Sequence, residues 1–595
     1  MTVAIRNYKS ELSKGQDRIQ LTLNGDVIEA VNGDSIAAAM VSAGERRFRE
    51  SKSEQPRGLF CGMGVCGECQ VMVDGVSRRA CLEKARDGQV VRAHPAKHDL
   101  ERSTQSIEVT DWQEESVDVL IVGAGPAGLA AAIAAAERDL DVLVIDERAQ
   151  AGGQYFKQPA TDFGIDEDRL DDQFREGADL IRSAQAAGVR FIAGAKAWGA
   201  FDEAKLAITV GRETLMVAAR RFLLASGAYE RPLAVPGWTL PGVMTTGAVQ
   251  TLLRAYRTVP GERILIAGNG PLNFQVAREL ALAGADVCAI AEAAASPIRS
   301  PLQFLRMAIA DPRSSLNGLR QVAGLRRRAV PVHFRHSIIR FDGTDRLESA
   351  TIGRIDADGN LVPGSEIEYP VDVACMNYGF LPQGELARAL GCEFKLDADS
   401  ASWKATRDTD GRTSVNRVFI AGDAAGLGGA RVALAEGEIA GCAIANDLGA
   451  TGAAEPQRSR RKLQRGRRFQ DALWAMFRAP SPTTRFTEPD TLVCRCEDVT
   501  LRELESAISE NCHSLAAVKK LTRAGMGRCQ GRYCAMTLAS VAADLGFEKA
   551  DADSFFAPRP PCKPVTVREI AGSVGDTPTA TALSTIDRQS NSCTE

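Results

Sequence analysis

The chain has 595 residues, of which 45% are hydrophobic and 25% are charged, and its formal net charge is −4. This length exceeds what one hydrophobic core supports and predicts several domains of ordinary soluble composition. The near-neutral charge gives no reason to expect nucleic-acid binding. The 15 cysteines fall into two sets of four and seven scattered residues. That distribution argues against a disulfide framework and predicts a reducing, cytoplasmic location.

Residues 1–105 are predicted to form a small α+β domain. Two strands meet at a turn at Asn24-Gly25, and a helix follows Asp34-Ser35. A set of cysteines follows in the pattern C-x4-C-x2-C-x11-C, whose opening is typical of plant-type [2Fe–2S] domains. Residues 1–105 thus resemble a ferredoxin-like (β-grasp) domain. Its members, which we name the first cysteine set, are Cys61, Cys66, Cys69 and Cys81. Glycines between them allow the loop to wrap a cluster. Zinc is the alternative, but zinc sites rarely use this spacing.

Residues 106–116 are polar and are predicted to be a linker. From residue 117 to about 450, strand and helix patterns alternate, which predicts an α/β fold with parallel sheets. Residues 117–240 open with VDVLIVGAGPAGLAAA, a strand, a glycine turn and a helix whose N-terminus faces a pyrophosphate. The second strand ends at Asp146-Glu147, the usual place for a carboxylate on the ribose hydroxyls.

Three further segments resemble the two-dinucleotide flavoprotein superfamily and imply FAD. They are the turn around Gly227, the segment IAGDAAG around Asp423, and a Glu-x4-Gly-Gly spacing that begins at Glu147. The resemblance implies that Asp423 binds the ribityl chain of the flavin. The predicted FAD contacts are Gly123, Gly125, Pro126, Ala127, Gly128, Asp146, Glu147, Arg148, Gly153, Gln154, Gly227, Gly422 and Asp423.

Residues 241–375 are predicted to form a second nucleotide-binding domain. Gly268 and Gly270 keep the fingerprint, but Asn273 replaces its third glycine, so helix and strand are expected to pack less closely. Glu292 ends the next strand, which favours NAD over NADP. Two alternatives stay open: a working nicotinamide site that uses Gly268, Gly270 and Glu292, or a relic of the fold.

Residues 376–454 are predicted to return to the FAD-binding domain, and residues 455–485 to form a basic connecting helix. This helix carries Phe469, Leu473 and Phe477 on one face. That face is expected either to pack on the domain surface or to dock on a partner protein or an anionic membrane. Docking on a membrane would place the protein peripherally on its inner face.

Residues 486–565 contain the second cysteine set, Cys494, Cys496, Cys529 and Cys534, spaced C-x-C-x32-C-x4-C. Thr500 and Glu503 predict a capping box for a helix. The segment resembles the helical [2Fe–2S] module of bacterioferritin-associated ferredoxin. It departs from that module in its last pair, which is separated by four residues instead of two. Zinc and the absence of a metal are the alternatives. Residues 566–595 are predicted to be a disordered tail.

The order of these parts resembles the alpha (A) subunits of multi-subunit bacterial amino-acid dehydrogenases, such as opine oxidases, hydrogen cyanide synthase, D-hydroxyproline dehydrogenase and heterotetrameric sarcosine oxidase. The resemblance rests on PRGLFCGMGVCGEC, VGAGPAGL, DERAQAGGQ, PGWTLPGVMTTGAVQTLL, AGNGPLN, MNYGFLP, IAGDAAG and CRCEDVT. It implies an electron-transfer chain with FAD and two [2Fe–2S] clusters, and in some members an FMN at a subunit interface.

The same resemblance implies a partner, a beta subunit of D-amino-acid-oxidase type that contains FAD and oxidises a C–N bond, and a quinone or electron carrier as external acceptor. No constellation of His, Tyr or Arg for amine binding stands out, so no catalytic residue is predicted. Two other hypotheses remain: a self-sufficient NAD(P)H-dependent flavin and iron–sulfur reductase, and a scaffold whose cofactors only hold structure.

Overall fold

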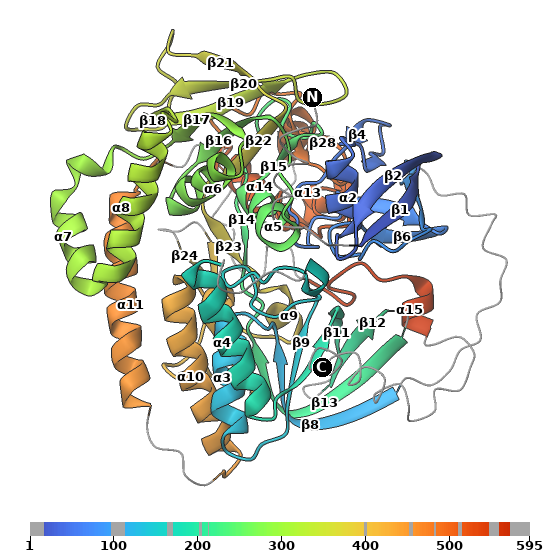
Figure 1. The fold of residues 1–595 in the computed structure, drawn as a ribbon, viewed down its shortest axis with the longest axis vertical. Helices are drawn as coiled ribbons and strands as arrows, with labels where there is room; N and C mark the ends of the chain where they lie inside the picture. The colour runs from blue at the N-terminus through green and yellow to red at the C-terminus, as the bar shows by residue number, and fades with distance from the viewer. Residues whose placement is uncertain are drawn as a thin grey trace.

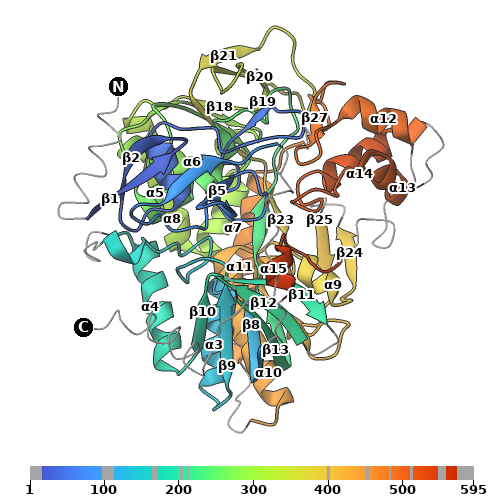
Figure 2. The ribbon, with the colours of Figure 1, turned by 90° about the vertical axis from the view of Figure 1, so that its right-hand side faces the viewer.

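The computed structural model describes residues 17–96, 113–163, 170–201, 205–211, 213–397, 402–450, 456–480, 484–509, 514–546 and 558–571. Figure 1 shows two α/β bodies stacked along the long axis, with the N-terminal domain (blue) beside the upper body. Figure 2 shows the domain that contains α12 to α14 as a separate lobe on the side of the same upper body.

The N-terminal domain contains a five-stranded sheet in the order β2-β1-β7-β5-β6, which is covered by helix α2 in the described residues. The elements are β1 (Arg18–Leu23), β2 (Asp26–Val31), α2 (Ile36–Ser42), β5 (Gln70–Val73), β6 (Val76–Arg79) and β7 (Val90–Ala93). The predicted hairpin is confirmed: β1 and β2 pair antiparallel, and Asn24 and Gly25 both have the positive φ that a tight turn requires. Ser35 caps α2, also as predicted.

The lower body is built on a seven-stranded sheet. Its strands are β8 (Gln113–Val122), β9 (Val142–Asp146), β10 (Arg190–Ala193), β11 (Ala195–Phe201), β12 (Lys205–Val210), β13 (Glu213–Leu224) and β26 (Val418–Ile420). β10, β9, β8, β13 and β26 run parallel, as the alternating pattern predicts. The first strand begins at Gln113 and not at residue 117, because residues 113–116 extend the pairing with β13 into the predicted linker.

Helices α3 (Pro126–Ala136) and α10 (Gly429–Asp447) lie against this sheet and against each other. Their backbones approach closely at Gly437, where an added Cβ would lie 2.1 Å from the Ala127 carbonyl oxygen. The approach joins the two sequence segments that form the flavin-type domain, 117–240 and 376–454.

The upper body is a five-stranded parallel sheet in the order β15-β22-β16-β17-β18. Its elements are β15 (Val243–Thr245), α5 (Thr246–Tyr256), β16 (Arg263–Gly268), α6 (Pro271–Leu282), β17 (Asp286–Glu292), α7 (Pro301–Ala310), α8 (Pro312–Arg327), β18 (Val332–Phe334) and β22 (Val373–Asn377). The predicted boundary at residue 375 falls inside β22, which belongs wholly to this sheet.

The two bodies are tied by β14 (Ala228–Glu230) and β23 (Phe380–Pro382), which pair antiparallel where the chain crosses between them. The basic segment forms α11 (Gln457–Met476). Its apolar face packs on α7, where Phe469 and Leu473 contact a cluster that contains Met307 and Met476. Of the two alternatives for this face, packing on the domain surface is confirmed.

The C-terminal lobe has its own core, formed by β27 (Leu492–Cys494), β28 (Val499–Thr500), α12 (Leu501–Ser509), α13 (Leu515–Thr522) and α14 (Ala535–Asp544). The predicted capping box is present: the Glu503 carboxylate accepts from the Thr500 N–H, and Thr500 Oγ1 accepts from the Glu503 N–H.

A segment that we name the C-terminal strap, residues 558–571, then returns to the seven-stranded sheet. The tail prediction is wrong for its first residues, since Val567–Ala571 form helix α15 and Glu569 is buried against Lys196. The remainder of the predicted tail, 572–595, lies outside the described residues.

Candidate functional site

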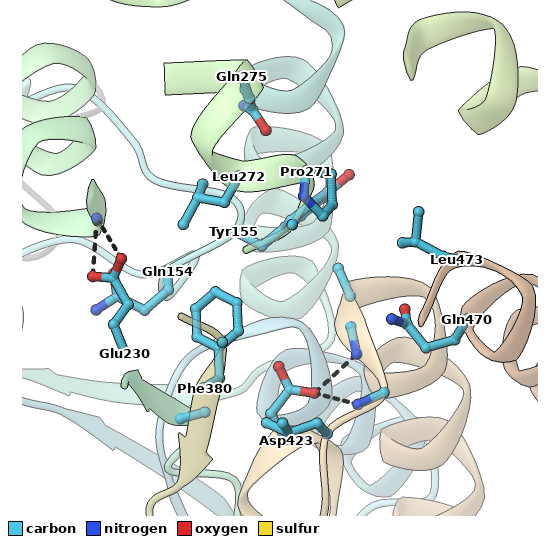
Figure 3. A pocket seen from close by; sticks show the side chains of 18 of the residues that line it. Gln154, Tyr155, Glu230, Pro271, Leu272, Gln275, Phe380, Asp423, Gln470 and Leu473 are labelled. Carbon is cyan, nitrogen blue, oxygen red and sulfur yellow. Dashed lines mark hydrogen bonds between the residues drawn. The ribbon is translucent and has the colours of Figure 1, made fainter. Parts of the chain in front are cut away.

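A cavity of about 1900 Å³ lies between the lower and upper bodies. It exceeds the roughly 300–1,000 Å³ that is usual for small-molecule sites, so it has room for an extended dinucleotide and a second ligand. Both glycine turns line it, through Gly125 and Gly270. In Figure 3, Asp423 enters from one side, and Leu272 and Gln275 of α6 enter from the other.

The first glycine turn has the geometry of a phosphate cradle. A Cβ at Gly123 would lie 2.5 Å from the Ala225 carbonyl oxygen, and one at Gly128 would lie 1.9 Å from that of Gly123. Gly125 faces the Gly153 backbone, and no side chain caps α3 at Gly125. The first turn of α3 therefore has no side-chain cap that competes with an anion for its N–H groups, and Pro126, at the first helical position, contributes no N–H.

The two adjacent carboxylates at the end of β9 have different roles. Asp146 accepts from the backbone N–H of Ala124 and of Arg148, both at 2.8 Å, so it holds the turn rather than facing a ribose. Glu147 lines the cavity and pairs with Lys563 at 2.6 Å and with Arg79 at 3.3 Å. Burial alone would raise the pKa of Glu147, but these two cations lower the pKa to about 2.

Asp423 lies in a short 3-10 turn, Gly422–Ala424, which precedes α10. One carboxylate oxygen accepts from the backbone N–H of Gly428 at 2.8 Å and of Gly429 at 2.9 Å (Figure 3). Burial raises the pKa of this carboxyl. Gly422 packs over Ala127 of α3, where an added Cβ would lie 2.9 Å from the alanine Cβ.

The remaining predicted flavin contacts also meet at the cavity. Arg148 Nη2 donates to Gln154 Oε1 at 3.4 Å. Gly227 has a positive φ of 75° at the end of the turn after β13. The predicted residues that line the cavity are Gly123, Gly125, Pro126, Ala127, Asp146, Glu147, Arg148, Gly153, Gln154, Gly227, Gly422 and Asp423. Gly128 lies beneath the turn instead.

The second glycine turn reaches the same cavity but differs in detail. Both oxygens of Glu292 are used inside its own fold, by the N–H of Gly270 at 3.0 Å and of Ala294 at 2.9 Å. Burial raises the pKa of Glu292 to about 7. Glu292 therefore shapes the turn, as Asp146 does in the first fold, and the contact with a ribose predicted for it is not supported.

Asn273 does not loosen the packing as predicted. Its buried amide accepts from Thr246 at 2.9 Å and donates to the Asn377 carbonyl at 3.2 Å. It thereby joins β22 and α5 to α6 at the place of the third glycine. Nearby, Asn269 Nδ2 donates to the Phe477 carbonyl, so the end of α11 lies across this part of the cavity.

A buried polar group at the back of the cavity has no counterpart among the predicted residues. Both oxygens of the Glu230 carboxylate accept from the Gly247 N–H, at 2.8 Å and 2.9 Å (Figure 3). One of them also accepts from Asn377 Nδ2 at 2.7 Å. Lys157 donates to Gln250 at 2.7 Å. Burial raises the pKa of Glu230 and lowers that of Lys157. No sequence motif marks these residues.

The first cysteine set lies in a loop of left-handed turns. Gly62, Gly64 and Gly67 have φ values of 61°, 79° and 71°, which glycine adopts without strain. All four sulfurs are buried. Burial would raise the pKa of Cys61, but Cys66 and the backbone amides that donate to its sulfur lower the pKa to about 6. A loop whose amides point at the sulfurs is suited to an anionic iron–sulfur group.

The second cysteine set also converges, despite the longer separation of its last pair. Gln530 and Gly531, with φ of 50° and 82°, form a turn that takes up the additional residues between Cys529 and Cys534. Cys494 interacts with Cys534, and the pKa of Cys494 falls to about 7, because that contact and nearby backbone amides outweigh burial.

In both sets the sulfurs are arranged in pairs. Cys61 pairs with Cys66 and Cys69 with Cys81, while Cys494 pairs with Cys534 and Cys496 with Cys529. Within the described ranges, no three His, Cys, Asp or Glu side chains converge on one metal-ion position. Two pairs of sulfurs in a set can offer two cysteine ligands to each of two irons.

Comparisons with known proteins agree with this architecture. Residues 117–437 match the pyridine nucleotide-disulphide oxidoreductase family, residues 16–95 match the 2Fe-2S iron-sulfur cluster binding domain, and residues 488–573 match the sarcosine oxidase A3 domain. The A subunit of opine oxidase from Agrobacterium tumefaciens (strain Ach5) is 33% identical over 488 residues, which cover 78% of this chain and 94% of that protein. The chain belongs to the family of opine oxidase A subunits.

Other members of this family group are similar at comparable levels. The hydrogen cyanide synthase subunit HcnB of Pseudomonas aeruginosa is 30% identical over 426 residues, 70% of this chain and 90% of that protein. Among solved structures, L-proline dehydrogenase from P. horikoshii superimposes with a TM-score of 0.67 at 20% identity, covering 93% of this chain and 97% of that one. This last similarity shows a shared fold.

Membership of this family confirms the predicted family, the α/β flavoprotein class and the N-terminal [2Fe–2S] domain, and the chain is an oxidoreductase. Within the part of the chain that the structure describes, no helix is long and apolar enough to cross a membrane. The contacts of Arg79, Lys563, Glu230 and Lys157 were not predicted. The only feature of the sequence that could have drawn attention to Arg79 is its position two residues before Cys81.

Proposed function

We propose that this chain is the electron-transfer subunit of a multi-subunit flavin- and iron–sulfur-dependent dehydrogenase. The substrate is an amino acid, an imino acid or an opine, and its C–N bond is oxidised on a separate beta subunit of D-amino-acid-oxidase type that contains FAD. Relatives named as subunits of opine oxidase and hydrogen cyanide synthase support an assembly of several chains.

One observation carries the proposal: the loop of the first cysteine set forms part of the wall of the nucleotide cavity. Met63 and Val65, which lie between Cys61 and Cys66, line it together with Asp423 and Gly125. A flavin at this site would therefore lie beside an iron–sulfur group. When bound, the flavin supplies two-electron chemistry, and iron–sulfur groups can accept its electrons one at a time.

The residues of this chain bind and orient the cofactors in this proposal. The N-terminus of α3 binds the pyrophosphate of FAD, and Asp423 binds the ribityl chain. Glu147 faces the adenosine end, where Arg79 and Lys563 hold it ionised. The two cysteine sets each ligate one [2Fe–2S] cluster. An FMN at a subunit interface and a quinone or electron carrier as final acceptor complete the assignment.

The test is purification of the tagged chain from its native host without oxygen. The complex should contain a second flavoprotein and should reduce an artificial dye with an amino acid, an imino acid or an opine. Cys69→Ser and Cys529→Ser should each leave substrate-dependent flavin bleaching intact and abolish dye reduction. Cys288→Ser, which lies outside both cysteine sets, is the matched control and should keep both activities. Dye reduction that survives both cysteine variants would instead support the scaffold hypothesis.

The second glycine turn favours one alternative function, an NAD(P)H-dependent flavin and iron–sulfur reductase. The turn reaches the cavity, and a Cβ at Gly270 would meet no atom within 4 Å, so space for a ligand exists there. Addition of NADH to the isolated chain under anaerobic conditions separates the two. An unchanged flavin absorbance supports the electron-transfer role within a complex, and rapid bleaching supports the reductase.

A further inference from the structure

The two cysteine sets lie side by side, although more than 400 residues separate them in sequence. Glu68, between Cys66 and Cys69, pairs with Arg495, which lies between Cys494 and Cys496, at 3.3 Å. Its other oxygen pairs with Arg49 at 2.7 Å. The exposed fractions of these side chains are 1% for Glu68 and 4% for each arginine.

The loops also touch where Gly67 meets a side chain and where two rings meet. A Cβ at Gly67 would lie 3.2 Å from the Cβ of Arg528, so a larger residue at this position would require the Arg528 side chain to shift. The Phe60 ring, next to Cys61, meets the Tyr533 ring, next to Cys534, at 5.4 Å between centroids. The Arg495 guanidinium covers Phe60 at 4.0 Å. The two loops are therefore held as one packed unit.

The two cysteine sets differ in their relation to the cavity. Its wall includes Met63 and Val65 from the first loop, whereas none of the described residues between 484 and 546 lines it. The first set thus borders both the cavity and the second set.

We propose that electrons leave the cavity through the iron–sulfur group of the first set and pass directly to that of the second, and that Glu68 is the positioning residue for this step. In each transfer one electron leaves the first group, which is oxidised, and enters the second, which is reduced. A reduced flavin in the cavity is the electron donor. The inference rests on the proposed function, because it requires a cluster in each set.

Glu68 has two effects in this arrangement. It fixes the spacing of the loops through Arg495, and its buried negative charge opposes the addition of an electron on either side. Because one carboxylate acts on both sets, removal of its charge should ease the reduction of both clusters together.

The first measurement is electron paramagnetic resonance of the dithionite-reduced full chain, with iron and sulfide content determined on the same sample. Two clusters in contact predict two signals broadened by mutual magnetic coupling. The paired variant Cys529→Ser/Cys534→Ser should leave one signal that is narrow and unsplit. This measurement needs no change at Glu68, so it stands even if Glu68 variants fold poorly.

The second measurement is a redox titration of Glu68→Gln. At a fixed potential the ratio of reduced to oxidised cluster should rise about tenfold for both clusters, which for a one-electron couple corresponds to about 59 mV. Glu29→Gln, an exposed carboxylate in the same domain, is the matched control and should change neither ratio.

The outcomes separate the two proposals. Two clusters without magnetic coupling, or a Glu68→Gln effect confined to one cluster, would overturn the inference and leave the proposed function intact. Iron and sulfide for one cluster alone would contradict the cofactor content of the proposed function itself.

Discussion

The ion pair between Glu147 and Lys563 joins the nucleotide cavity to the C-terminal strap, and its removal should destabilise the protein measurably. The two atoms are 2.6 Å apart, and the side chains are only 13% and 16% exposed. Folding lowers the pKa of Glu147 from 4.5 to about 2, which corresponds to about 3 kcal/mol of stability at neutral pH. Loss of one partner of a buried pair costs a similar amount, about 3–5 kcal/mol.

The assay is urea-induced unfolding followed by circular dichroism for the wild type, Glu147→Gln, Lys563→Met and the double variant. The single variants should lose about 3 kcal/mol each, and the double variant should lose less than their sum. Glu114→Gln is the matched control, because its pair with Lys205 has a similar length of 2.8 Å but is 65% and 38% exposed. An exposed pair contributes about 0–1 kcal/mol.

The pH dependence gives the sign of the effect. A carboxyl whose pKa is lowered by folding stabilises the folded protein above its unfolded pKa, and that contribution is lost as the pH falls from 4.5 towards 2. The difference between the wild type and Glu147→Gln should therefore stay constant from pH 8 to pH 5. A difference that shrinks within this range, or one no larger than that of the control, would refute the reasoning.

Three further predictions test the packing and the cofactor site. Gly437→Val should lower the melting temperature, since its side chain would collide with the Ala127 carbonyl and overpacking costs about 1–3 kcal/mol; Gly318→Ala, in open space on a helix, should raise the melting temperature slightly. Asp423→Ala should reduce the flavin content of the purified chain, measured by absorbance after denaturation, and full retention would contradict its assignment. Thr500→Ala should speed amide exchange in the first turn of α12 by removing a cap that contributes about 1 kcal/mol; unchanged exchange would show that the cap is dispensable.

The confirmed predictions of local structure rest on short sequence patterns. The turn at Asn24-Gly25, the glycine turn at Gly123 and the capping box at Thr500 each depend on residues a few positions apart. Backbone geometry within such short segments is restricted by sterics and by nearby hydrogen bonds. The spacing of each cysteine set likewise identified residues that the structure brings together.

Contacts between distant segments could not be predicted in this way. Arg495 and Glu68 are 427 positions apart, and Lys563 and Glu147 are 416 apart. Neither pair belongs to a periodic pattern, and a single sequence does not tell which cation reaches which carboxylate. For Glu292 the end of the strand was predicted, but the sequence did not show that backbone N–H groups of its own turn donate to both carboxylate oxygens.

The C-terminal strap restricts the movement of the C-terminal lobe. The backbone N–H of Cys562 donates to the Trp198 carbonyl at 2.6 Å, and Lys196 donates to the Pro564 carbonyl at 2.9 Å. The lobe is thus anchored at its far end to the lower body, while Trp238 donates to the Leu492 carbonyl from the upper body at 2.6 Å. A lobe fastened at both ends does not swing between a loading and a discharging position, as tethered carrier domains do. In the proposed electron-transfer role the acceptor would have to come to this lobe, so the rate of its oxidation should depend on the acceptor concentration and not on a domain rotation.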